Sequence, residues 1–297
     1  MILKKICCQL YLWLGKLHIT KPVVMVMVDG GLCSQMHQLM MGEILKEKGH
    51  TVEYDLSFFK TGLDLNNLAN RPFLINKVFP NYSFRKASSL KVNIYKRLFI
   101  NCGKYPAEVD KSWLNKSAPV LLHGYYSDIP EMYDKGGLFA RLWKLDAGIL
   151  SERNRKVLGL IESTNSVGIH VRRGDLSTYN SVYGNPVSID YLIKGIEHFL
   201  AEREKPMFFF FSDDTQYVKD VLIPSIKMNI SFEVIESEQD RVYEDFILLS
   251  FCKDLITSKG TMGKYAALYG NAKTVVLAND DRQKFIVESL PCKKVII

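Results

Sequence analysis

Apolar runs of strand length alternate with helical patterns through much of this 297-residue chain. The first run covers residues 23–28, is apolar at every position and ends at Asp29-Gly30-Gly31. A helical pattern follows over about residues 35–48, with Gly49 placed to end it, and residues 51–54 predict a second strand. A wholly apolar strand that leads into a helix and another strand indicates a parallel sheet covered on both faces.

The alternation is most regular from about residue 162 onward. Strands are predicted over five segments, residues 166–171, 207–212, 232–235, 254–257 and 274–277. Helical patterns lie between them at residues 189–203, 216–223, 240–252 and 263–269. This βαβαβ series predicts a Rossmann-like domain. The intervening residues 55–159 are less regular and hold one clear strand candidate, residues 120–123.

The pattern therefore predicts an α/β architecture of two Rossmann-like halves that face a cleft. We place an N-terminal domain at residues 22–160 and a C-terminal domain at residues 161–297, after an N-terminal extension of residues 1–21. A chain of this length has room for two domains of ordinary size.

The extension combines lysines with a short apolar run. Lys4, Lys5 and Lys16 surround the largely apolar residues 6–14, which are too few to span a bilayer. No small-residue cleavage site of a signal peptide follows the run. Two interpretations stay open: residues 1–18 lie on a membrane surface as a basic amphipathic segment, or they form an ordinary packing helix.

Composition narrows the class of protein and of partner. Hydrophobic residues make up 47% of the chain and charged residues 24%, which is typical of a globular protein rather than a disordered or fibrous one. The net charge of +7 favours an anionic partner, either nucleic acid, a membrane or a phosphorylated ligand. The six cysteines include no C-x-x-C pair, so we expect free thiols in a reducing cytoplasm and no zinc site.

Polar clusters follow four of the predicted strands, at the edge where a parallel sheet binds its ligands. They are Asp29-Gly30-Gly31, His170-Val171-Arg172-Arg173-Gly174-Asp175, Ser212-Asp213-Asp214 and Thr257-Ser258-Lys259-Gly260-Thr261. Each has a plainer interpretation: a tight turn for the glycine pair, a solvated turn for the arginine pair, and helix capping for the aspartates. Three of the clusters fall at strand ends of one predicted sheet, and this concurrence favours a binding site.

The chemistry of these clusters suits a nucleotide diphosphate. Guanidinium groups such as those of Arg172 and Arg173 bind phosphate oxygens in a bidentate manner. Backbone N–H groups at Gly260 and at the start of the next helix would add an anion site, and Asp213 can accept from base or ribose donors. We expect no metal site, because Asp213 and Asp214 are adjacent rather than spaced as D-x-D.

Five stretches of the chain carry a family resemblance. They are G-G-L-C-S-Q-M-H-Q from Gly30, L-H-G-Y-Y from Leu122, V-G-I-H-V-R-R-G-D-L from Val167, F-F-F-F-S-D-D from Phe208 and D-F-I-L-L-S-F-C-K-D-L-I-T-S from Asp245. The third resembles the H-x-R-R-x-D motif of the α-1,2-fucosyltransferases, glycosyltransferase family 11, within the wider α-1,2-, α-1,6- and protein O-fucosyltransferase superfamily. The others are similar, in order, to further motifs of that family. The resemblance covers roughly residues 22–280.

The resemblance implies a GT-B-like fold, with GDP-β-L-fucose bound mainly by the C-terminal half, and inverting, metal-independent transfer without a cofactor. By position, Arg172 and Arg173 would hold the departing β-phosphate, and His170 would shape the site. The remaining donor-binding residues implied are Asp213 or Asp214 for guanosine, Ser258 and Thr261 for phosphate, and Gly30 and Gly31. Arg172 and Asp175 are the candidate catalytic residues, with Asp175 as general base.

Two departures from the family pattern fall at these motifs. Cys33 and Ser34 replace the Gly-Asn pair of G-G-L-G-N-Q. Residues 258–265 replace a tryptophan-containing loop and look nearer to the G-T-F-G form of animal members. Both departures leave the donor motifs in place and bear on the choice of acceptor.

The function expected from the resemblance is that of a galactoside 2-α-L-fucosyltransferase. It would act on a galactose-terminated surface glycan in the cytoplasm, at the inner face of the membrane. One alternative is a non-catalytic GDP-sugar- or glycan-binding protein on the same fold. A nucleic-acid binder, prompted by the net charge and the basic residues 86–97, is disfavoured because no recognised nucleic-acid motif is present.

Overall fold

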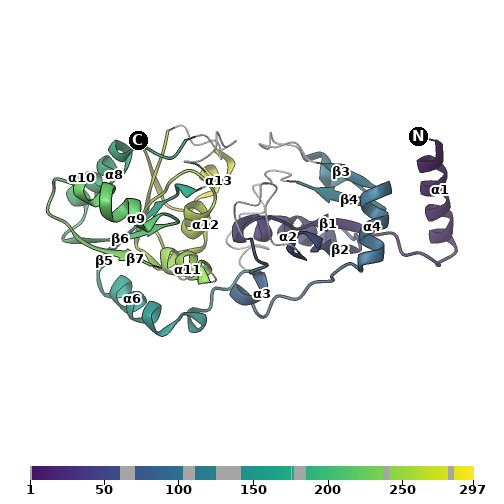
Figure 1. Ribbon diagram of the computed structural model, residues 1–297, viewed down its shortest axis with the longest axis horizontal. Coiled ribbons are helices and arrows are strands. Elements are labelled where there is room, and N and C mark those ends of the chain that lie inside the picture. The colour runs from purple at the N-terminus through teal and green to yellow at the C-terminus, as the bar shows by residue number, and fades with distance from the viewer. Residues whose placement is uncertain are drawn as a thin grey trace. The chain divides into compact units, whose positions relative to one another are not determined.

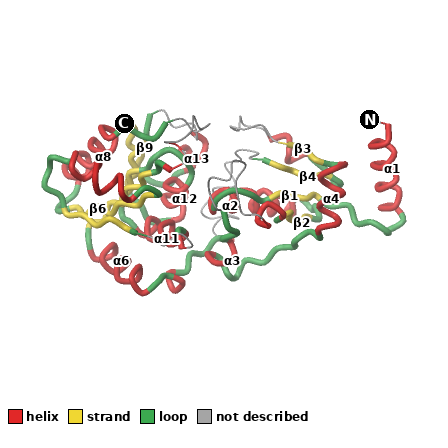
Figure 2. Tube along the Cα trace, viewed as in Figure 1, coloured by secondary structure: helices red, strands yellow, loops and turns green. Residues whose placement is uncertain are grey.

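The computed structural model describes residues 2–60, 71–102, 111–124, 142–174, 176, 185–236, 241–279 and 284–297 (Figures 1 and 2). The chain folds into two compact units, Met1–Lys144 and Leu145–Ile297. Each unit has its own parallel β-sheet and its own helices. The predicted α/β class, with two Rossmann-like units that each hold a parallel sheet, is confirmed.

The first unit holds a four-stranded sheet in the order β2-β1-β4-β3. Its strands are β1 (Val24–Met27), β2 (Val52–Asp55), β3 (Ile100–Cys102) and β4 (Val120–His123), and every neighbouring pair is parallel. Val24 of β1 pairs with Val52 on one side and with Val120 on the other. The residues that follow β1, β2 and β4 therefore lie along one edge of this sheet.

The helix α2 (Leu32–Glu47) packs against β1 and β2. Gly42 allows a close approach, because a side chain at this position would run into the ring and hydroxyl of Tyr54. That hydroxyl donates to the carbonyl of Leu39, 2.9 Å away. Among the described residues of this unit, the other helical segments apart from α1 are Ser57–Lys60, α3 (Ile75–Val78), α4 (Ser89–Leu98) and Lys111–Asn115.

The extension forms helix α1 (Ile2–Lys16), which lies beside α4 (Figure 1). Tyr11 is its buried contact, with its ring centroid 5.9 Å from that of Tyr95 and 5.2 Å from that of Phe99. The Tyr95 hydroxyl accepts from the backbone N–H of Val23 at 2.9 Å, which links this cluster to the start of β1. One face of α1 is thus a packing face.

The second unit holds a six-stranded sheet in the order β10-β9-β8-β5-β6-β7, and all its strand pairs are parallel. The strands are β5 (Asn165–Val171), β6 (Pro206–Ser212), β7 (Ser231–Ile235), β8 (Asp254–Ile256), β9 (Thr274–Leu277) and β10 (Lys293–Ile296). From β5 the chain adds β6 and β7 on one side, then crosses back and adds β8, β9 and β10 on the other. This is the Rossmann order, with its switch point between β5 and β8.

Helices accompany this sheet along the chain. Those in the described part of the unit are α6 (Glu152–Ser163), α8 (Ile189–Glu202), α9 (Thr215–Tyr217), α10 (Ile223–Ser225), α11 (Tyr243–Phe251), α12 (Met262–Tyr269) and α13 (Lys284–Ser289), with a 3-10 turn at Ala147–Ile149 and a π-helical turn at Val218–Leu222. Val167 and Ile169 of β5 pack in one core with Phe199 of α8. Gly168 and His170 point to the opposite face, where Gly168 lies against Leu249 of α11.

Strand β6 carries four consecutive phenylalanines, residues 208–211. All four are fully or almost fully buried. Successive side chains of a strand point to opposite faces, so both faces of β6 are covered.

The second unit begins earlier than the expected boundary at residue 161, because α6 packs against α11. Ser151, which caps α6, donates from its N–H and its hydroxyl to the buried carboxylate of Glu244, at 3.0 and 2.8 Å. Residues 145–160 therefore belong structurally with the C-terminal sheet.

Candidate functional site

The switch point of the second sheet gathers most of the predicted site residues. β5 ends at Val171 and its neighbour β8 ends at Ile256, so the segments after them meet at one edge. Ligands of open α/β sheets bind at this position. The arginine cluster and the loop from Ser258 to Thr261 lie here.

His170 is a buried, neutral member of this group. Its Nδ1 lies 3.1 Å from the hydroxyl oxygen of Ser258. Burial, and then the positive charges of Arg172 and Lys264, lower the pKa of His170 to about 3. The ring is therefore uncharged at neutral pH and orients Ser258, whose hydroxyl also accepts from the backbone N–H of Arg172 at 3.1 Å.

The guanidinium group of Arg172 lies over Gly260. A side chain at Gly260 would collide with Nη1 of Arg172, and the φ of +107° at this residue is one that glycine adopts without strain. The carbonyl of Gly260 accepts from Nζ of the fully buried Lys264 at 2.6 Å. Arg172 and Lys264 thus bring two positive charges to one glycine, an arrangement suited to an anion.

Arg173 is held by the cluster that follows β6. Its backbone N–H donates to Oδ1 of Asp213 at 2.8 Å, and its guanidinium carbon lies 3.5 Å from the ring centroid of Tyr217. Its Nε lies 3.6 Å from Oδ2 of Asp214. Gly174 follows Arg173 and passes close to the same carboxylate. A Cβ atom at Gly174 would lie only 2.8 Å from Oδ2 of Asp213, so the close approach favours glycine.

Asp214 also caps the helix that follows it. Its carboxylate accepts from the backbone N–H of Tyr217 at 3.0 Å, so the capping interpretation holds for this aspartate. Thr261 is the residue before α12, and its side chain makes no capping hydrogen bond there.

Gly30 and Gly31 belong to the first unit, at the carboxyl end of β1. Gly30 has a φ of +70°. The preceding Asp29 accepts from Nε2 of Gln38 at 2.7 Å, and its other oxygen lies 3.1 Å from Nε2 of His123 at the end of β4. The structure therefore places these two glycines on a different sheet from the arginine cluster.

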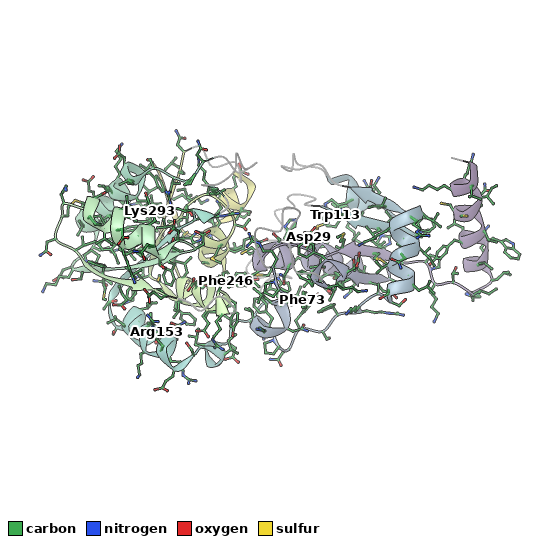
Figure 3. The ribbon with its side chains drawn as sticks, in the orientation of Figure 1. Asp29, Phe73, Trp113, Arg153, Phe246 and Lys293 are labelled. Atoms are coloured by element: carbon green, nitrogen blue, oxygen red, sulfur yellow. The ribbon has the colours of Figure 1, made fainter. Side chains whose placement is uncertain are left out.

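A cavity of about 490 Å³ lies at the same edge of the first sheet, beside the end of β2. Its lining includes four aromatic rings and two lysines: Phe59, Phe73, Tyr82, Phe84, Lys60 and Lys86. Phe73, labelled in Figure 3, has its ring centroid 5.2 Å from that of Phe59 and 5.7 Å from that of Phe84. Partly exposed aromatic faces beside polar groups suit a sugar ring.

Sequence reasoning missed several residues of these sites. The sequence marks Lys264 only as a departure from the family loop, and Tyr217 carries no signal beyond its position three residues after Asp214. Gln35 lies in the motif that begins at Gly30, but its role does not follow from the motif: its amide donates to the carbonyls of Gly30 and Pro72, both at 2.9 Å.

Two predicted features lie outside the described residues, namely Asp175 and the Tyr125-Tyr126 pair. Within the described ranges, no group of three or more histidine, cysteine, aspartate or glutamate side chains is arranged to hold a metal ion.

Comparison with known proteins places this chain in a family. The family model described as "Glycosyl transferase family 11" matches residues 55–289. The galactoside alpha-(1,2)-fucosyltransferases 1 of Mico humeralifer and Alouatta caraya are each 32% identical over 118 residues, which cover 38% of this chain. The match spans 31% of the length of each of these relatives.

Two solved structures similar to this chain are also sugar transferases. NodZ alpha-1,6-fucosyltransferase soaked with GDP-fucose has a TM-score of 0.47 at 13% identity, over 84% of this chain and 93% of that one. E. coli ADP-heptose lps heptosyltransferase II has a TM-score of 0.43 at 12% identity, over 93% of this chain and 90% of that one. Because the family model matches residues 55–289, which is most of this chain, the chain belongs to glycosyl transferase family 11.

Proposed function

We propose that this protein is a galactoside 2-α-L-fucosyltransferase that moves L-fucose from GDP-β-L-fucose to the 2-hydroxyl of a galactoside. The observation that carries the proposal is the cationic switch point, where Arg172 and buried Lys264 meet at Gly260 beside a neutral His170. Membership of the family and the names of the relatives support the choice of fucose and of galactoside.

The positive charge at the switch point suits the leaving group. In the proposed displacement, the acceptor oxygen bonds to the anomeric carbon of fucose as the bond from that carbon to the β-phosphate oxygen breaks. GDP leaves with the electron pair, and the hydroxyl proton passes to a base, for which Asp175 is the candidate. Arg172 would stabilise the charge that develops on the phosphate, by about 3–4 kcal/mol for a well-placed donor. Buried Lys264, bound to the carbonyl of Gly260, would add its positive charge without touching the phosphate.

We assign the guanosine to the cluster after β6. The second carboxylate oxygen of Asp213 lies close to Gly174, and the guanidinium group of Arg173 is stacked on the ring of Tyr217. These contacts hold Asp213 and Arg173 in place beside the proposed diphosphate site. Arg172 and Arg173 supply cationic groups of the kind that neutralise a diphosphate, and we propose that transfer needs neither a divalent metal nor another cofactor.

We assign the acceptor sugar to the aromatic cavity of the first unit. Its rings present flat apolar faces, and Lys60 and Lys86 can donate to hydroxyl oxygens. We expect Phe73→Ala to raise the KM for a galactoside while leaving the affinity for GDP unchanged.

Substitution of Arg172 tests the chemistry. Arg172→Ala is expected to lower the release of GDP from GDP-fucose in the presence of a galactoside by about 10²–10³-fold. Arg153→Ala, which removes an exposed arginine from α6, is the matched control and should turn over normally. Near-normal turnover of Arg172→Ala contradicts the assignment.

A donor screen separates the enzyme from its alternative. Binding of GDP-fucose, GDP-mannose and UDP-sugars is measured by calorimetry, and turnover is then followed over a panel of galactosides with and without EDTA. We expect preference for GDP-fucose and turnover that EDTA does not reduce. Tight GDP-fucose binding without turnover on any galactoside would instead support a non-catalytic GDP-sugar-binding protein.

A further inference from the structure

Helix α1 has an exposed apolar stripe on the side away from its packing face. The side chains of this stripe are Leu3, Ile6, Leu10 and Trp13, and Leu17 continues it in the turn directly after the helix. They recur at intervals of three and four residues, which puts them on one side of a helix. Leu3 is 74% exposed and Trp13 55% exposed, whereas Tyr11 is buried against α4.

The charge of this segment has a single sign. Residues 1–28 contain Lys4, Lys5, Lys16 and Lys21 and no aspartate or glutamate. With 3.6 residues per turn, Lys5 and Lys16 point within about 20° of each other, along one border of the stripe. Lysines beside a face of leucine and tryptophan are typical of helices that lie in the interface of an anionic bilayer.

The length of α1 fits a helix that lies along a bilayer surface. Its 15 residues rise about 22 Å, whereas the hydrocarbon core of a bilayer is about 30 Å thick. In the part of the chain that the structure describes, no helix is long and apolar enough to cross a membrane.

A second copy of the chain fits the stripe less well. The 3–4 spacing is that of a coiled coil, but α1 offers only about two heptads, fewer than a stable two-stranded coil needs. The flanking positions Gln9 and Lys16 would bring no opposite charges together between two copies.

We propose that α1 binds the surface of a bilayer that contains anionic lipids. The apolar stripe enters the interface between headgroups and acyl chains, and the lysines contact the headgroups. The packing of Tyr11 against Tyr95 and Phe99 fixes α1 to the first unit, so that unit is held at the membrane. The proposal does not depend on the transferase activity.

Tryptophan fluorescence of the whole chain provides the test. The chain has three tryptophans, of which Trp113 and Trp143 are buried, so Trp13 is the one placed to report on a bilayer. Vesicles of phosphatidylcholine with about one third phosphatidylglycerol are expected to shift the emission to shorter wavelength and to sediment the protein. We expect binding about tenfold weaker or less on phosphatidylcholine alone, and salt should reduce the difference.

One variant and a matched control give the test its specificity. Leu10→Glu places a charge in the stripe and is expected to weaken vesicle binding at least about tenfold. Leu90→Glu makes the same change at an exposed leucine of α4, 73% exposed, and should bind as the wild type does. Circular dichroism of both variants shows whether the fold is kept.

Two results would overturn the proposal. One is equal vesicle binding by wild type and Leu10→Glu. The other is a dimer in solution that Leu10→Glu dissociates, together with no vesicle binding by the wild type, because the stripe would then be an interface between copies of the chain.

Discussion

Arg172 is positioned by a residue that has no side chain. Gly260 leaves the space that the guanidinium group occupies, and the same glycine offers its carbonyl to Lys264. The loop therefore sets the direction of two cations through one residue. The backbone conformation of Gly260 is unstrained for glycine and would be strained for alanine.

Substitution of Gly260 is predicted to weaken donor binding. Gly260→Ala forces the loop or Arg172 to move, so we expect the affinity for GDP, measured by calorimetry, to fall about tenfold, equivalent to ~1.4 kcal/mol. Gly49→Ala is the matched control, because Gly49 has a φ of +89° and open space around it. It should lose stability and keep its GDP affinity; an equal loss of affinity in both variants argues against a specific role for Gly260.

His170 predicts a pH dependence of stability. Its folded-state pKa of about 3 lies below the value near 6.5 expected for an unfolded chain. Between these values the unfolded state binds more protons, so the free energy of unfolding falls as pH drops below about 6.5, by at most ~1.4 kcal/mol per pH unit. Urea unfolding at several pH values measures this slope.

His170→Gln keeps a neutral hydrogen-bonding group beside Ser258 and should flatten that slope. His50→Gln removes a histidine outside the site and controls for the replacement itself. An unchanged slope in His170→Gln would show that this ring does not titrate as inferred.

The residues at the strand ends could be predicted from the sequence because parallel strands end at a common edge. His170, Arg172 and Ser258 are brought together for this reason. The role of Lys264 could not be predicted, since its contact with Gly260 depends on how the loop turns into α12. The pairing of Asp29 with His123 likewise depends on the strand order of the first sheet.

At the scale of elements, the joint between α6 and α11 depends on one buried carboxylate. Glu244 accepts from Ser151 and Asn154 of the α6 N-terminus, and Arg241 pairs with it. Arg241 also donates to the carbonyl of Ile149 at 3.0 Å. These contacts hold the start of the second unit onto its sheet.

Glu244→Gln is predicted to destabilise the second unit. The amide loses the charge that pairs with Arg241 and keeps one acceptor oxygen, so we expect a loss of about 3 kcal/mol in the free energy of unfolding. Urea unfolding measures it. Glu152→Gln, at an exposed position of α6, should change stability by less than about 0.5 kcal/mol; a similar small effect for Glu244→Gln would contradict the role assigned to this joint.

The central strands and the edge strands β2 and β7 were predictable, whereas the edge strands β3 and β10 were not. β5 and β6 are apolar along most of their length because both of their faces are covered, and this produces a clear pattern. β3 has three residues and β10 begins with two exposed lysines, so neither gives a buried-strand signal. The segment from α9 to α10 mixes helix types, and a single 3.6-residue period describes it poorly.

At the scale of the whole molecule, the predicted donor residues are divided between two sheets. His170, Arg172 and Ser258 belong to the second unit, whereas Gly30 and Gly31 belong to the first. The motif order in the sequence implied this division. A solution measurement of ligand contacts can test each unit separately.

Hydrogen exchange provides that measurement. GDP-fucose is predicted to slow exchange in residues 171–174 and 257–263 and also in residues 29–31, because ligand binding stabilises the state that binds it. At a ligand concentration of 100 Kd the stabilisation is about 2.7 kcal/mol. Protection confined to the second unit would show that Gly30 and Gly31 are not donor contacts. Arg172→Ala, measured in parallel, should lose the protection.

The four phenylalanines of β6 have a consequence for biosynthesis. Phe208 and Phe210 pack in the core that includes α8, which precedes them in the chain, but α11, which lies against the opposite face of β5, is translated later. Until α11 emerges from the ribosome, Phe209 and Phe211 belong to an unfinished, strongly apolar strand, and such strands are prone to aggregate. The yield of folded protein should therefore depend on translation rate and on chaperones during this interval.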